Sequence, residues 1–97
     1  MPKFVFVING QNFKMKFEGN IQKVGFYTTR RVENDDIDAA ERLALDSIRT
    51  ELEDLVLNDR NDPPMMYIES IYEVESFEDY PVPGEGATWY VENDDEE

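Results

Sequence analysis

The chain of 97 residues has the size of one domain, and 40% of its residues are hydrophobic, which is enough for a packed core. It contains neither cysteine nor histidine, which excludes disulfides, thiolate and imidazole metal ligands, cysteine nucleophiles and histidine acid–base catalysis. The formal net charge of −14 opposes binding to nucleic acid and to anionic membrane surfaces. The composition therefore favours a protein that is not an enzyme and that has no cofactor or metal.

The charge is unevenly distributed along the chain. Residues 1–31 hold six basic residues and one acidic residue, a net charge of +5, whereas residues 32–97 hold three basic and 22 acidic residues, a net charge of −19. We expect the basic strands to lie beside acidic ones in one sheet, where opposite charges on neighbouring strands attract. The alternative is a basic face that selects a partner of opposite charge.

No segment has the length of a targeting or membrane signal. The apolar run Phe4–Ile8 has five residues, whereas a signal-peptide core needs about 7 to 15 and a membrane span about 20. We therefore expect a cytoplasmic protein with no membrane partner.

The first half of the chain alternates large apolar residues with smaller or charged ones. The alternation predicts two strands, about residues 4–8 and 13–18, with a type I′ turn at Asn9-Gly10 that places Phe6 opposite Phe13. A third strand, about residues 24–32, is rich in aromatic and β-branched residues. We expect Val24, Phe26, Thr28, Arg30 and Val32 to face the core, with Gly25, Tyr27, Thr29 and Arg31 on the other side.

The second half predicts one helix and two further strands. Apolar residues at helical spacing indicate a helix over about residues 36–57, with Asp35 or Asp36 as its N-cap and Pro63-Pro64 beyond its end. Strands follow over about residues 65–77 and 87–91, separated by a loop. In the strand over residues 65–77, Ile71 has the same parity as Glu69 and Glu73. This placement indicates a bulge near Ser70 or a second face of the strand that is partly covered.

The expected order is β-β-β-α-β-β, an α+β fold. We expect residues 1–91 to form a single domain, a two-layer sandwich of about five antiparallel strands with one long helix on one face. Residues 92–97 form an acidic tail with no reason to order. One face of the sheet, or an edge strand, is the candidate surface for a protein partner, including a second copy of the chain. The residues expected to contact a partner are Val5, Val7, Tyr27, Arg31, Tyr67 and Ile71.

Three motifs have residues that other chemistry could use. The run Asn58–Asp62 has oxygen ligands, but an arginine and a proline occupy key positions of a calcium loop. The run Gly84–Gly86 precedes no helix and carries a glutamate where phosphate would approach. Glu69 and Glu73 could share one strand face, the geometry that raises the pKa of one carboxyl for acid–base work, although chance adjacency is expected among 23 acidic residues. The abundance of carboxylates leaves open a divalent-metal-binding protein, and the overall acidity leaves open an inhibitor or immunity protein, of antitoxin type, that mimics nucleic-acid phosphate.

A resemblance to a known family rests on most of the chain. The runs concerned are GFYTTRRVENDDIDAAERLALDSIRTEL at residues 25–52, VLNDRNDPP, YIESIYEVESF and PVPGEGATWYVE. They resemble a family of small, acidic bacterial proteins of uncharacterised function, which implies a cytoplasmic single-domain protein and assigns no catalytic residue. The strand order is also similar to that of HicB-type antitoxins, as an analogy of fold alone.

Overall fold

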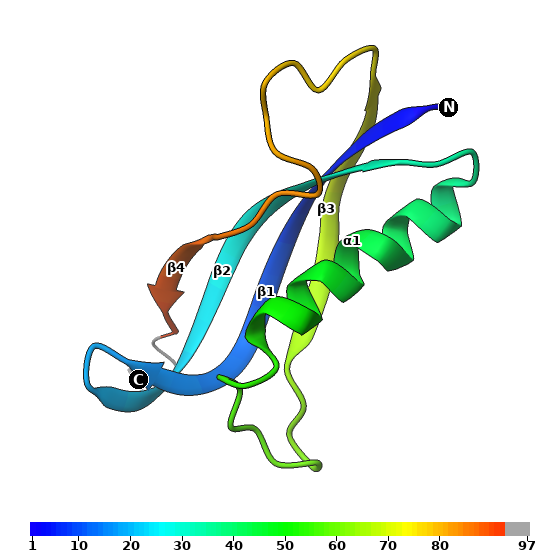
Figure 1. Cartoon of the computed structure of the whole chain (residues 1–97). Coiled ribbons are helices and arrows are strands. Elements are labelled where there is room, and N and C mark those ends of the chain that lie inside the picture. The colour runs from blue at the N-terminus through cyan, green and yellow to red at the C-terminus, as the bar shows by residue number, and fades with distance from the viewer. Residues whose placement is uncertain (93–97) are drawn as a thin grey trace.

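The computed structural model describes residues 1–92, which form four strands and one helix (Figure 1). In chain order the elements are β1 (Lys3–Phe17), β2 (Asn20–Glu33), α1 (Ile37–Leu52), β3 (Met65–Val74) and β4 (Thr88–Val91). The strands form one antiparallel sheet in the order β3-β1-β2-β4. The α+β class and the antiparallel sheet are confirmed, whereas the prediction of about five strands is wrong, since the first two predicted strands are one.

The predicted turn at Asn9-Gly10 lies in the middle of β1. Gly10 pairs with Phe26, and a Cβ atom at this position would overlap the Phe26 ring. Asn9 is 1% exposed, and its Nδ2 donates to the Phe26 carbonyl at 3.0 Å and to the Tyr90 hydroxyl at 3.0 Å. Asn9 and Gly10 therefore allow β1 and β2 to approach closely. The burial of these two residues in the sheet outweighs the preference of Asn-Gly for a turn.

The hairpin turns instead at Glu18-Gly19. Phe17 pairs with Asn20, and the two residues between them have φ of 54° and 88°. Positive φ at both central residues is what a type I′ turn requires. Moving the turn by nine residues makes β1 and β2 a long hairpin at the centre of the sheet.

A bulge in β1 is held by the loop that follows α1. The register with β2 shifts between Gly10 and Phe13, and Asn12 has φ of 62°. Asn12 Nδ2 donates to Asp62 Oδ1 at 2.8 Å, and Lys23 Nζ lies 3.2 Å from Oδ2. The hydrogen bond from Asn12, and then the contact with Lys23, hold the pKa of Asp62 below its ordinary value.

Helix α1 is shorter than the predicted range of residues 36–57. Asp36 is its N-cap, as predicted, and accepts a hydrogen bond from the Asp38 N–H at 3.1 Å. The helix ends at Leu52, and the Leu57 N–H then donates to the Lys14 carbonyl of β1 at 2.7 Å. The last apolar residues of the predicted helix thus belong to a connection that joins β1. Within residues 1–92, no helix combines the length and the apolar character needed to cross a membrane.

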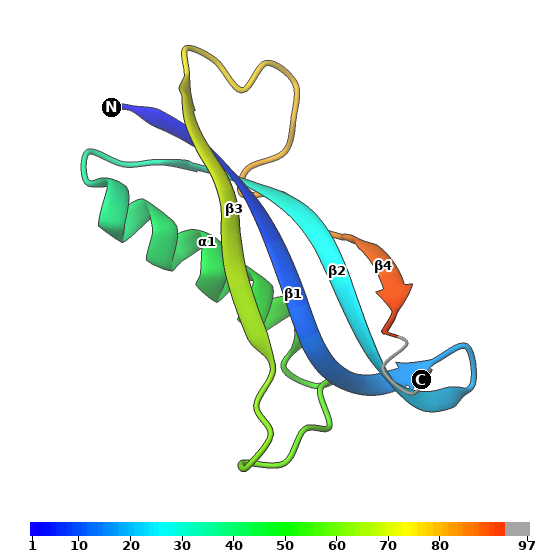
Figure 2. The ribbon, with the colours of Figure 1, turned by 180° about the vertical axis from the view of Figure 1, so that it is seen from behind.

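Helix α1 packs on one side of the sheet, as Figure 1 shows. Figure 2 shows the molecule from behind, with β3, β1 and β2 in front of the helix. The apolar stripe of α1 meets the large apolar side chains of the central hairpin. The most buried members of this core are Phe6, Ile8, Val24, Phe26, Ala40, Ala44 and Ile48. In the part of the chain described, helical cover is confined to this side.

Strand β3 ends at Val74, before the predicted limit of residue 77. Its register with β1 shifts, because Val7 pairs with Ser70 and Ile8 pairs with Ile68, which leaves Glu69 without a partner. The bulge predicted near Ser70 is thereby confirmed. At the other edge, β4 is followed by Glu92, which donates its N–H to the Lys23 carbonyl at 3.0 Å and accepts from the Asn12 N–H at 2.8 Å. The rest of the predicted acidic tail, residues 93–97, lies outside the described residues.

Candidate functional site

The side of the sheet opposite α1 is here named the open face. Directly opposite side chains in antiparallel strands point to the same side, so the register defines this face. Along β1 its residues alternate with the phenylalanines that pack under the helix. From Lys3 to Asn9 of β1 and across to the other strands, the members are Lys3, Val5, Val7 and Asn9 in β1, Glu33, Arg31, Thr29 and Tyr27 in β2, Val74, Tyr72, Ser70 and Tyr67 in β3, and Thr88 and Tyr90, the latter opposite Gly25, in β4. Glu33 is the acidic residue of this set, and its carboxylate lies 3.3 Å from Lys3 Nζ.

The aromatic residues are sorted between the two sides of the sheet. All five tyrosines lie on the open face or beside it: Tyr27, Tyr67, Tyr72 and Tyr90 at its pairing positions and Tyr80 above Arg31. The core under α1 contains Phe4, Phe6, Phe13 and Phe26, with Trp89 packed against it. A phenol keeps a hydroxyl for water or a partner, whereas a phenyl ring gains by complete burial. The open face is therefore an amphipathic aromatic surface.

Five of the six residues expected to contact a partner lie on this face. Tyr27 and Tyr67 are 49% and 42% exposed, whereas Val5 is buried among its neighbours. Val7 and Arg31 are half-buried.

The placement of Ile71 needs correction. Ile71 pairs with Phe6, a core residue, so its side chain points to the α1 side of the sheet. The bulge at Glu69 reverses the parity of the strand between Tyr67 and Ile71, which is the physical reason.

Sequence reasoning missed Tyr72 as an open-face residue. Tyr72 pairs with Val5 and is 51% exposed. The bulge near Ser70 was the signal that could have found it, because one extra residue moves Tyr72 to the side of Tyr67. Tyr90 was missed because the sequence predicted no neighbour for the last strand. In the structure this strand, β4, pairs with β2, and the centre of the Tyr90 ring lies 5.9 Å from that of the Tyr27 ring.

A pocket lies at one end of the open face, and we name it the Arg31 pocket. The loop between β3 and β4 arches past this end of the sheet (Figures 1 and 2). The pocket has a volume of about 320 Å³. Its lining comes from the sheet, with Val5, Thr29, Arg31, Tyr72 and Val74, and from the loop, with Ser76, Phe77, Glu78 and Tyr80. The guanidinium carbon of Arg31 lies 4.2 Å from the centre of the Tyr80 ring, a cation–π contact.

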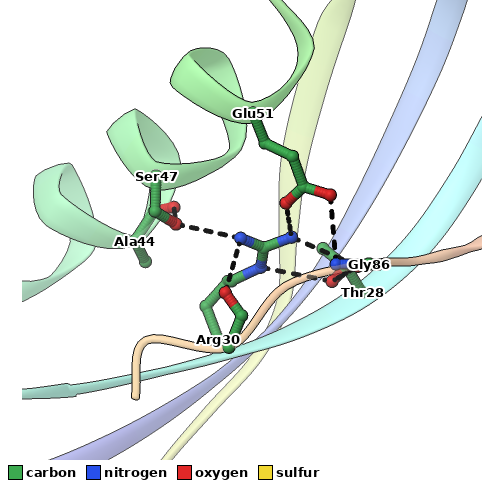
Figure 3. Close-up of polar contacts among 7 residues, drawn as sticks. Thr28, Arg30, Ala44, Ser47, Glu51 and Gly86 are labelled. Carbon is green, nitrogen blue, oxygen red and sulfur yellow. Dashed lines mark hydrogen bonds and ion pairs between the residues drawn. The ribbon is translucent and has the colours of Figure 1, made fainter. Parts of the chain in front are cut away.

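Arg30, the preceding residue, lies on the α1 side and is 2% exposed (Figure 3). Its Nη2 donates to Glu51 Oε1 at 2.8 Å, and its Nη1 donates to Ser47 Oγ at 3.2 Å. The remaining bonds go from Nη1 to the Gly84 carbonyl, from Nη2 to the Gly86 carbonyl and from Nε to Thr28 Oγ1. All five donors of this guanidinium are used, so Arg30 joins β2, α1 and the loop before β4 and has none left for a ligand.

Neither clustered acidic side chains nor the apolar groove beside α1 adds a second site among the described residues. Among residues 1–92, no group of three or more acidic side chains is arranged to hold a metal ion. An apolar groove of about 430 Å³ lies between α1 and the sheet, lined in part by Phe13, Ile48 and Leu52. These three side chains are core residues, so the groove is a continuation of the core.

Comparison of the chain with protein-family models, curated proteins and solved structures gives no match. The resemblance to a family of small acidic bacterial proteins stays a prediction from the sequence.

Proposed function

We propose that this protein is a small nonenzymatic interaction module that binds a protein partner through its open face. The observation that carries the proposal is the gathering of all five tyrosines on or beside this face, while four of the six phenylalanines are in the core. Tyrosine is enriched in protein interfaces because it offers a large contact area at a low cost in side-chain entropy, together with a hydroxyl. Tyr27, Tyr67 and Tyr72 already stand 49%, 42% and 51% exposed.

The open face is favoured over the edge strand as the contact surface. Strand β3 has ten residues and an unpaired outer edge, which is a possible template for another strand. However, it carries the bulge at Glu69 and a second exposed charge at Glu73. Inserted charge and a bulge are the features by which proteins prevent pairing at a sheet edge. A partner that binds across the open face meets neither the bulge nor the charges at the β3 edge.

The charge of the molecule favours a different protein over a second copy. Two chains with a formal charge of −14 each repel one another. The proposal keeps the two-layer arrangement of helix and sheet, and the cytoplasmic location, that the sequence predicts.

Site-specific photo-crosslinking in the source cells tests the proposal. Benzoylphenylalanine is placed at Tyr67 or Tyr27 on the open face, and at Leu43, which is 51% exposed on α1, as the control. We expect a discrete protein adduct from the open-face positions and none from Leu43. Once the adduct identifies the partner, Tyr67→Ala should weaken binding by about 2 kcal/mol, as for a central aromatic contact.

Two outcomes would contradict the proposal. Adducts from Leu43 alone would place recognition on α1 and favour an acidic inhibitor that mimics nucleic-acid phosphate. An adduct of twice the mass of the chain would identify the partner as a second copy. Tyr67→Ala should change the free energy of unfolding by less than about 0.5 kcal/mol, because the side chain is exposed, so loss of binding would not reflect loss of fold.

A further inference from the structure

Two consecutive arginines of β2 differ in how their guanidinium groups are satisfied. Arg30 uses all five donors within the protein. Arg31 points to the opposite side of the sheet, and among residues 1–92 its guanidinium makes no hydrogen bond and no ion pair. Five N–H donors in a rigid planar group therefore remain available at the Arg31 pocket.

The Arg31 side chain is nevertheless held in place. Its guanidinium stacks on the Tyr80 ring at 4.2 Å, and its backbone N–H donates to the Pro83 carbonyl at 2.8 Å. Both contacts come from the loop between β3 and β4, which forms the outer wall of the pocket. A half-buried guanidinium that is oriented before a ligand arrives loses less entropy on binding.

Residues with hydroxyl groups line the same pocket as Arg31. Thr29, Tyr72 and Ser76 are three of them. Ser76 Oγ accepts the Glu78 N–H at 2.8 Å, which leaves its own proton to donate. The pocket thus combines a forked cationic donor with neutral donors, the arrangement that suits a planar, two-oxygen anion.

We propose that the Arg31 pocket binds a carboxylate group carried by the polypeptide partner of the open face. This inference rests on the proposed function, because the pocket is continuous with the open face through Val5, Thr29 and Tyr72. A carboxylate is favoured over a phosphate dianion by charge. The lining holds one guanidinium and the carboxylate of Glu78, and the chain carries −14 in total, so a second negative charge on the ligand is repelled.

The experiment uses small probes and the full chain, so that no partner is needed. The Arg31 Nε–H signal is followed by NMR at a mildly acidic pH while acetate, N-acetylglycine, N-acetylglycinamide or sulfate, which is a dianion at this pH, is added. N-acetylglycine mimics the carboxylate end of a peptide, and its amide is the neutral control. We expect N-acetylglycine to shift the Arg31 signal and to bind more tightly than acetate, while the amide leaves the signal unchanged.

Three variants complete the test. Arg31→Gln should weaken N-acetylglycine binding by about tenfold or more, since a charge-assisted bond is lost. Arg31→Lys should restore little of it, because an ammonium lacks the planar fork. Arg42→Gln makes the same change at an exposed position of α1 and should bind like the parent chain. Unchanged melting temperatures establish that the variants are folded.

Each contrary result overturns a specific part of the proposal. Equal shifts with the acid and the amide, or unchanged binding by Arg31→Gln, would remove the carboxylate site. Acetate binding as tightly as N-acetylglycine would assign the pocket to a free small anion, and tighter binding of sulfate would reverse the choice of ligand charge. A chain that binds N-acetylglycine but gives no open-face crosslink would retain the pocket and lose the proposed function, so the two failures are distinguishable.

Discussion

At the scale of single residues, the environment decides what a residue does more than its type. Asn9-Gly10 is a strong turn pair in isolation, yet in the folded chain Asn9 is 1% exposed and Gly10 admits the Phe26 ring. Arg30 and Arg31 are chemically identical neighbours, and the alternation of a strand sends one to the core side and the other to the open face.

Gly10→Ala tests the packing role of this glycine. The new Cβ would overlap the Phe26 ring, so the ring or the backbone must move, and we expect a loss of about 2–3 kcal/mol in the free energy of unfolding. Urea denaturation measures the loss. Gly19→Ala is the control, because Gly19 has φ of 88° and no neighbouring atom within 4 Å of an added Cβ, so only backbone strain of about 1 kcal/mol applies. Equal losses for the two variants would contradict the packing explanation.

At the scale of elements, hydrogen bonds from a few polar side chains connect β2, α1 and the loop before β4. The loop before β4 is tied to α1 through Glu51, which accepts from Arg30 Nη2 through one carboxylate oxygen and from the Gly86 N–H, at 3.1 Å, through the other. The same guanidinium reaches the Gly84 and Gly86 carbonyls. This cluster fixes the loop that also forms the wall of the Arg31 pocket (Figure 3).

Glu51→Gln should loosen this connection. The Glu51 side chain is 35% exposed, so solvent already weakens the pair, and we expect a loss of about 1–2 kcal/mol in the free energy of unfolding. Amide exchange at Gly86 should accelerate as well. Glu53 is the exposed C-cap of α1. Glu53→Gln should therefore leave the free energy of unfolding within about 0.5 kcal/mol of that of the parent chain. If both variants unfold alike, the Arg30 cluster does not hold the loop.

At the scale of the whole molecule, the sheet order brings oppositely charged segments together. The hairpin of β1 and β2 contains the basic residues of the N-terminal part, and it lies between the edge strands β3 and β4 from the acidic part. Its lysines make two of the four ion pairs among the described residues. Lys3 with Glu33, at 3.3 Å, joins β1 to β2, and Lys23 with Asp62, at 3.2 Å, joins the hairpin to the loop before β3, so within residues 1–92 no ion pair joins the hairpin to β3 or β4. The acidic residues still outnumber the basic ones by 14.

Because of this excess charge, added salt should stabilise the protein. Self-repulsion of a chain with charge −14 weakens as the Debye length falls from about 30 Å at 0.01 M to about 8 Å at 0.15 M salt. We expect the melting temperature in calorimetry to rise over that range. Glu53→Lys lowers the charge from −14 to −12 and should show a smaller rise. A melting temperature that falls with salt would mean that the ion pairs outweigh the repulsion.

The amino-acid sequence alone determined the α+β class, the start and N-cap of the helix, the bulge near Ser70, and the place on the open face of five of the six residues expected to contact a partner. These follow from local periodicity, which survives in the fold wherever one side of an element is buried. Tertiary structure alone decided that β1 runs through Asn9-Gly10, that Ile71 and not Tyr72 points to the helix, and that, within residues 1–92, Arg31 keeps its donors free while Arg30 uses all of its own. The physical reason is that pairing of distant strands buries whole side chains, and a one-residue shift in a strand reverses every side chain beyond it.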